Sequence, residues 1–68
     1  MRPSEAQIGE KVSYFRYKGL KPENGIIKQI CYDTTYVWIV TDCKNDWGNY
    51  YDYNAEKVNV NELEKGWV

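Results

Sequence analysis

One stretch, residues 25–42, constrains the fold of this chain more than any other part of it. It reads GIIKQICYDTTYVWIVTD, two apolar runs on either side of a polar break at Asp33, Thr34 and Thr35. The runs are rich in β-branched and aromatic residues, which suit a pleated and half-buried surface. The stretch therefore predicts a central β-hairpin against which the rest of the chain must pack.

Weaker patterns on both sides of the hairpin predict the remaining strands. Alternating residues indicate a first strand over residues 11–17, and turn formers in KGLKPEN (18–24) separate it from the hairpin. The hairpin arms are residues 25–32 and 36–41, and residues 55–60 suit a fourth strand.

The two ends of the chain carry short helical signals. Residues 1–7 form a polar lead-in with room for at most one turn, because no apolar helical period follows. Near the other end, Asn59 or Asn61 can cap one turn over residues 61–65, which Gly66 would end in a left-handed conformation. The last two residues then make a short strand or a plug.

Both hairpin arms deviate from simple alternation. Ile27 and Ile30 cannot lie on the same face of a regular strand, so we expect a β-bulge near Lys28 or Gln29. In the arm 36–41 both faces are apolar, which suits the middle of a small closed sheet.

The length and these elements together predict a single all-β domain over residues 1–68. A chain this short buries only about 60% of its unfolded surface, and eleven aromatic residues help to supply the buried area. Short strands with turns about every 8–12 residues are typical of small barrels. We predict an SH3-like barrel of four to five antiparallel strands with one short 3-10 or helical turn near the C-terminus. A five-stranded OB-type barrel is the alternative, although it usually has longer strands and a mid-chain helix.

Charge and composition bear on the location of the protein. Its net charge of −1 predicts neither strong nucleic-acid binding nor adhesion to membranes. Residues 1–28 hold six basic and three acidic residues, a net +3, whereas residues 29–68 hold three and seven, a net −4. No apolar run approaches the about 20 residues of a membrane span, and the opening MRPSEAQIGEK lacks the apolar core of a signal peptide. We expect a cytoplasmic protein in which Cys31 and Cys43 are free thiols.

The residue types argue against an enzyme and against a cofactor. The chain has no histidine, so a Ser–His or Cys–His nucleophile pair is impossible. Carboxylates recur at Asp42, Asp46 and Asp52, but a core of this size leaves little volume for a cleft in which they could converge. A calcium loop beginning at Asp42 would have Lys44 at a ligand position and Trp47 where glycine is required. We therefore predict neither a catalytic nor a metal site.

Protein recognition is the function that the sequence favours. The 42–54 loop and the preceding strand hold more large aromatic residues than so small a core can bury on one side, and Tyr and Trp are the residues that most often dominate binding interfaces. We predict a partner-binding surface made of these aromatics and one acid: Trp38, Trp47, Tyr50, Tyr51, Tyr53 and Asp46. The alternative is that Trp47 and two of the tyrosines merely cover the end of the barrel.

Two other kinds of partner remain open. Basic residues alternate with Tyr14, Phe15 and Tyr17 in the first half of the chain, a pattern that can contact phosphates and stack bases. This weak nucleic-acid module would use Lys11, Arg16, Lys18, Lys21 and Lys28. The near-neutral net charge disfavours it. A self-assembling accessory protein is a third possibility.

Four motifs together resemble a group of small uncharacterised proteins from phages and prophages. They are IGEKVSY, KPENGIIK, YVWIVTDC followed by NDW, and NELEKGW at the end of the chain. Glu62 stands where the tail of that group has an aspartate. The resemblance implies a phage or mobile-element origin and an SH3-like core. It carries no activity, but it makes a host or defence protein a natural partner.

Overall fold

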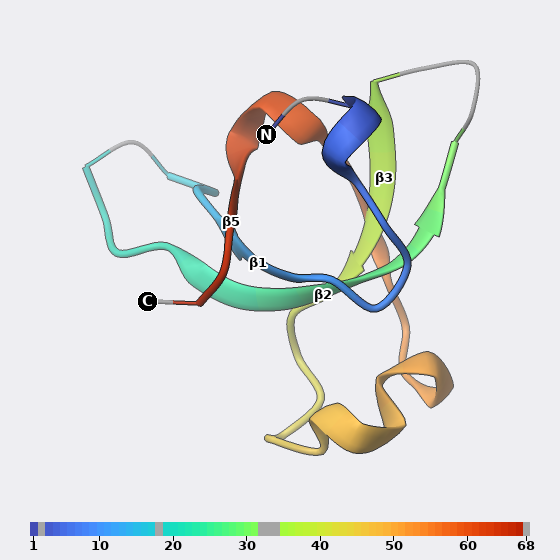
Figure 1. Ribbon diagram of the computed structural model, residues 1–68. Coiled ribbons are helices and arrows are strands. Elements are labelled where there is room, and N and C mark those ends of the chain that lie inside the picture. Colours follow the sequence, from blue (N-terminus) through green and yellow to red (C-terminus); the bar gives the residue numbers. More distant parts are fainter. Residues whose placement is uncertain (2, 18, 32–34, 68) are drawn as a thin grey trace.

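Five antiparallel strands in the order β4-β3-β2-β1-β5 build the domain (Figure 1). The computed structural model describes residues 1, 3–17, 19–31 and 35–67. The strands are β1 (Lys11–Tyr14), β2 (Glu23–Ile30), β3 (Tyr36–Val40), β4 (Glu56–Asn59) and β5 (Leu63–Lys65). The described residues also form three 3-10 helices: η1 (Pro3–Glu5), η2 (Trp47–Asp52) and η3 (Val60–Glu62).

The connectivity is that of a small SH3-like barrel. Strands β1 to β4 form a meander, and β5 returns to pair with β1. The edge strands β4 and β5 are joined directly by the three residues of η3, so the sheet must curl to bring its two edges together. Figure 1 shows β1, β2, β3 and β5 arranged around a shared interior. The predicted all-β fold with a helical turn near the C-terminus is confirmed.

The core lies inside this curl and comes from alternate residues of each strand. Because side chains alternate across a strand, Val12 and Tyr14 of β1 point inward together, as do Val37 and Ile39 of β3. The buried cluster consists of Val12, Tyr14, Ile27, Val37, Ile39, Val58, Val60 and Leu63, with Met1, Ala6 and Ile30 packed against it.

The predicted bulge in β2 is confirmed. Ile27 pairs with Ile39, and the next pair joins Gln29 to Trp38, so Lys28 is an extra residue on β2. The insertion changes the alternation, and Ile27 and Ile30 therefore both pack in the core. Its other consequence is that Lys28 and Gln29 both lie on the outer face.

Several predicted boundaries were wrong by a few residues. The first strand ends at Tyr14 rather than at residue 17, because its pairing with both β2 and β5 ends there. Strand β2 begins at Glu23, two residues early, because Glu23 and Asn24 continue the pairing with β1. The predicted end of that strand, at residue 32, falls outside the described residues.

The C-terminal segment differs more from the prediction. Asn59 does cap a turn, since its side-chain oxygen accepts a hydrogen bond from the Asn61 amide at 2.9 Å. The turn ends at Glu62, and the residues predicted to continue it form β5 instead. Pairing with β1 satisfies their backbone groups, which a single isolated turn would leave partly unbonded. Gly66 has the expected positive φ, 85°, but it follows a strand.

The 42–54 loop packs on the outer face of the sheet. Ile26, Val40 and Cys43 are buried but are not part of the main core cluster. Helix η2 packs against β2 on the side opposite the barrel interior (Figure 1). Both cysteines are free thiols, as predicted.

Candidate functional site

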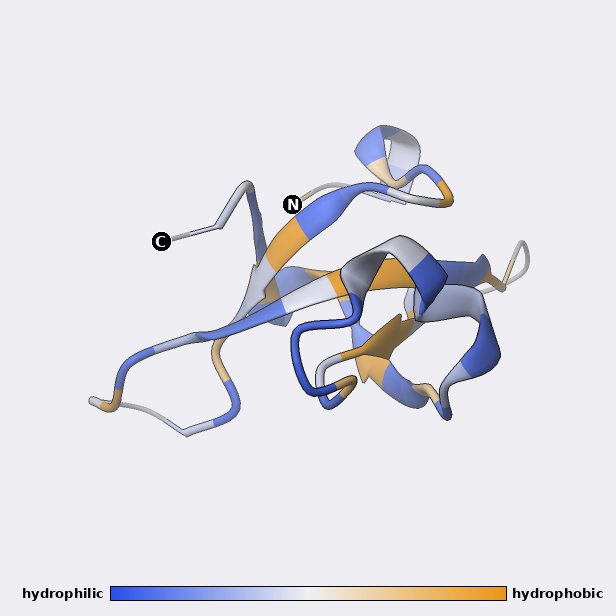
Figure 2. Ribbon diagram, turned by 90° about the horizontal axis from the view of Figure 1, so that it is seen from below, coloured by the Kyte–Doolittle hydropathy of each residue, from blue (hydrophilic) through white to orange (hydrophobic). Residues whose placement is uncertain are grey.

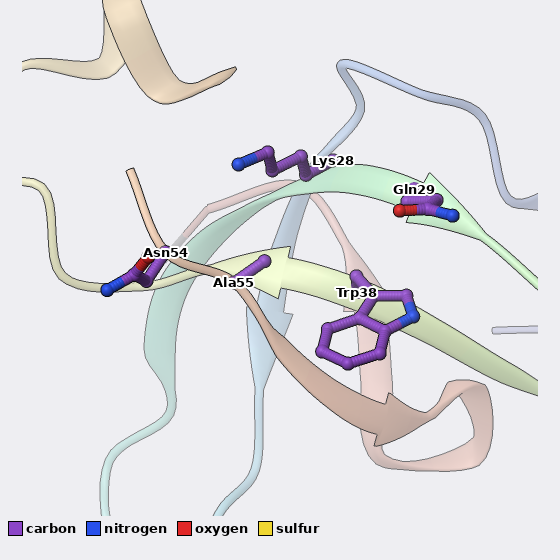
Figure 3. A pocket seen from close by; sticks show the side chains of 5 residues that line it. All are labelled: Lys28, Gln29, Trp38, Asn54 and Ala55. Carbon is purple, nitrogen blue, oxygen red and sulfur yellow. The ribbon is translucent and has the colours of Figure 1, made fainter. Parts of the chain in front are cut away.

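A pocket lies on the outer face of the sheet beside Trp38, one of the predicted aromatic residues. Its volume is about 210 Å³. Figure 3 shows the side chains that surround it: Lys28 and Gln29 from β2, Trp38 from β3, and Asn54 and Ala55 from the segment after η2. None of these five residues is acidic. We call it the Trp38 pocket.

The bulge in β2 supplies one wall of the Trp38 pocket. In a regular strand only one of two consecutive residues can lie on the outer face. Here Lys28 and Gln29 together oppose Trp38, so both line the recess beside the indole ring. The pocket is therefore a direct consequence of the isoleucine spacing that requires the bulge.

The opposite wall is held by a hydrogen bond across the pocket. The Lys28 ammonium donates to the backbone oxygen of Tyr53 at 2.7 Å. This bond ties β2 to the segment that carries Asn54 and Ala55, and it places a positive charge at the rim. An ammonium has three N–H donors, so two remain for a ligand.

A second lysine lies on the other side of the indole ring. Lys57 of β4 is the direct cross-strand partner of Trp38, so the two side chains share the outer face. The Lys57 ammonium lies 5.1 Å from the ring centroid of Tyr36, within the range of a cation–π contact. The outer face of β2, β3 and β4 thus combines an indole ring with two lysines.

Asp46 of the predicted surface serves the internal structure of its loop. One carboxylate oxygen accepts a hydrogen bond from the Tyr53 hydroxyl at 2.9 Å, and the other accepts one from the Asn49 side chain at 3.0 Å. The bond to Asp46 raises the pKa of the Tyr53 phenol, because it stabilises the protonated form. Asp46 therefore holds η2 in place.

Trp47 packs on the C-terminal tail. Its ring lies 4.7 Å from that of Trp67 at a tilt of 54°. The Trp67 indole N–H donates to the backbone oxygen of Gly25 at 2.9 Å, and the Lys11 ammonium lies 4.7 Å from the Trp67 ring centroid. Trp67 thus fits the predicted plug. The Trp47 ring packs against another side chain of the same domain.

The remaining two aromatics of the predicted surface differ in exposure. Tyr50 is half-buried, and its hydroxyl lies near Gly9. Tyr51 is 57% exposed and meets the edge of the Tyr50 ring. Trp47, Tyr50 and Tyr53 are each half-buried and contact other residues of the domain. Their role in partner binding stays a prediction.

The described residues of the nucleic-acid alternative make different local contacts. Arg16 forms ion pairs with Glu23 and Glu56, which raise the pKa of its guanidinium and neutralise its charge. Lys11 lies over Trp67, Lys28 lines the Trp38 pocket, and Lys21 is exposed in the β1–β2 loop. Lys18 lies outside the described residues.

Sequence reasoning missed two surface features. The first is the group around Trp38: Gln29, Asn54, Ala55 and Lys57. The predicted bulge could have placed Gln29 beside Trp38. The sequence around residues 54, 55 and 57 contains no pattern that predicts a pocket. The second is the loop between β1 and β2, where Tyr17 is 62% and Leu20 64% exposed. Figure 2 shows this loop extending away from the sheet.

The described residues contain neither a cluster of potential metal ligands nor a helix suited to cross a membrane. No three Cys, Asp or Glu side chains in this part of the chain come together as a potential metal site. The longest helix there is η2, with six residues, and no helix has the length and apolar character that crossing a membrane requires.

Comparisons of the chain with protein-family models, with curated proteins and with solved structures found no match.

Proposed function

We propose that this protein is a small non-enzymatic binding module that recognises a protein partner at the Trp38 pocket. The observation that carries the proposal is the position of Trp38, a half-buried indole that forms one wall of an open recess on the outer face of the sheet. A ring held in this way offers a large apolar contact at little entropic cost, which is why Trp is favoured in binding interfaces.

The size of the pocket supports a protein partner over a small molecule. Sites for cofactors and drug-sized ligands usually occupy about 300–1,000 Å³, whereas the Trp38 pocket holds about 210 Å³. An enclosed apolar cavity of about 150 Å³ accommodates a benzene ring. The recess therefore suits one large side chain from a partner chain.

The origin and location of the protein belong to the same proposal. The resemblance of KPENGIIK and the other three motifs to small phage and prophage proteins supports a phage or mobile-element origin. A protein of that origin would act in the cytoplasm of a host cell, and its partner would be a host protein.

The weak nucleic-acid module is the competing function. The structure favours it less than the sequence did, because the charge of Arg16 is balanced by two carboxylates. Phosphate binding depends on a collective positive field.

Affinity capture with matched variants tests the proposed function. The bait is the tagged protein in nuclease-treated host lysate, and the partner is identified by mass spectrometry. We expect Trp38→Ala and the pocket-filling Asn54→Trp to lose the partner that the unaltered protein captures. Tyr51→Ala, which removes an exposed ring elsewhere, should retain it.

Two results would contradict the proposal. One is a partner that Trp38→Ala and Asn54→Trp still capture but that Leu20→Ser in the β1–β2 loop loses. The other is recovery only when nucleic acid is present. Because Trp38→Ala removes a half-buried ring, near-native circular dichroism spectra of both pocket variants are required for the comparison.

A further inference from the structure

We propose that the Trp38 pocket binds an acidic peptide segment, with one bulky apolar side chain in the recess and flanking carboxylates on Lys28 and Lys57. This inference rests on the proposed function, and it specifies the chemistry of the partner. Lys28 and Lys57 carry it, because they lie on either side of the indole ring and face outward with it.

Among the described residues, Lys28 and Lys57 have no ion-paired carboxylate, in contrast to Arg16 and Lys65. Arg16 is paired with Glu23 and Glu56, and Lys65 lies 3.9 Å from Glu5. Neither lysine of the pocket is ion-paired with any carboxylate in the part of the chain that the structure describes. Their charge is thus left for a ligand to balance.

Both ammonium groups are also held in place. Lys28 is hydrogen-bonded to the Tyr53 backbone oxygen, and Lys57 lies over the Tyr36 ring. A charge that is already positioned loses less side-chain entropy when it meets a carboxylate. The strands that carry these lysines are separated by β3 alone, so their backbones lie roughly 10 Å apart. A peptide a few residues long spans that distance.

The same arrangement favours a peptide over a single-stranded nucleic acid. Two lysines neutralise only about two phosphates, and such a contact yields little affinity at physiological salt. An acidic peptide adds a second contact, because its apolar side chain fills a recess of suitable volume.

The test uses three defined peptides and ¹⁵N-labelled protein. The first has a phenylalanine between two pairs of aspartates, the second has lysines in place of the aspartates, and the third has alanine in place of the phenylalanine. All are capped at both ends. NMR titration follows the Trp38 indole N–H, with the Trp47 and Trp67 indoles as internal references.

We expect saturable shifts of the Trp38 signal with the aspartate–phenylalanine peptide. Alanine in place of phenylalanine should weaken binding at least about ten-fold, since most of the buried apolar area is lost. Lys57→Gln should weaken it up to about five-fold, as for an exposed ion pair, whereas Lys21→Gln in the β1–β2 loop should leave it unchanged. Raising the salt concentration from 0.05 to 0.5 M should weaken binding further, because it screens the two lysines.

Three outcomes would overturn the inference. In the first, the lysine peptide binds as tightly as the aspartate peptide. In the second, the shifted signals belong to residues away from Trp38. In the third, an oligothymidylate saturates the protein at a lower concentration than the acidic peptide does. Failure of the acidic-peptide inference can be distinguished from failure of the proposed function. If no peptide binds but the Trp38-dependent capture of a protein persists, the acidic-peptide inference alone is refuted. Capture that is insensitive to Trp38 refutes both.

Discussion

Deletion of Lys28 is the sharpest test of how the sheet and the pocket arise together. Lys28 is the extra residue between the pairs Ile27–Ile39 and Gln29–Trp38. Removing it leaves a regular strand in which every pair of the β2–β3 ladder can be kept. The deletion should therefore preserve the fold while removing the Lys28 part of the pocket wall, an outcome that is unusual for a deletion inside a strand.

The cost of this deletion follows from what Lys28 contributes. Its side chain makes one charge-assisted hydrogen bond, to the Tyr53 backbone oxygen. Such bonds stabilise by about 1.5–3 kcal/mol when buried, and this one is partly exposed, so we expect a loss of about 1–2 kcal/mol. For a domain of this size that lowers Tm by roughly 5–15 °C. Thermal denaturation followed by circular dichroism measures the shift.

A deletion in an unbulged strand provides the control. Removing Trp38 from β3 would put Val37 and Ile39 on opposite faces, because side chains alternate along a strand. We expect that variant to be unfolded, with collapsed amide dispersion in its NMR spectrum. An unfolded Lys28 deletion, or a folded Trp38 deletion, would refute our account of the bulge.

Three further predictions concern the 42–54 loop. Trp47→Ala should lower the free energy of unfolding by about 2 kcal/mol, because it removes the packing on Trp67, and the near-ultraviolet circular dichroism signal should weaken with it; unchanged stability would show that this contact is dispensable. Lys44 has a φ of 52° in the turn before η2, so Lys44→Gly should raise stability in urea by about 0.5–1 kcal/mol, whereas Lys44→Ala should not. The pKa of Tyr53 is raised by its bond to Asp46, so the stabilisation from that bond is complete below the ordinary tyrosine pKa of about 10 and is lost as pH rises through the raised value. Tyr53→Phe should reduce this alkaline loss of stability, and an identical pH profile in the variant would contradict the assignment.

Much of the fold could be predicted because its signals are local. The β-branched and aromatic runs of the hairpin, and the incompatible spacing of Ile27 and Ile30, are properties of neighbouring residues. Boundaries were less predictable. Residues 63–65 form a strand because β1 is available to pair with them, and their own sequence carries no such information.

The candidate site was predictable only in part, for the same reason. Trp38 and the bulge were visible in the sequence. The internal use of Asp46 and the packing of Trp47 on Trp67 depend on how the 42–54 loop crosses the outer face of β2. Residues of like type in one loop do not have to form one surface.

The sequence by itself determined where the two hairpin arms lie and that the first of them needs a bulge, since both follow from the pattern of neighbouring residues. Only the tertiary structure decided which outward residues meet. Lys28, Trp38 and Lys57 come from three strands, and Asn54 and Ala55 come from the segment after η2. Their juxtaposition depends on the register between strands and on the path of the loop. Both are set by the free energy of the whole domain, and no single segment of the chain determines that free energy.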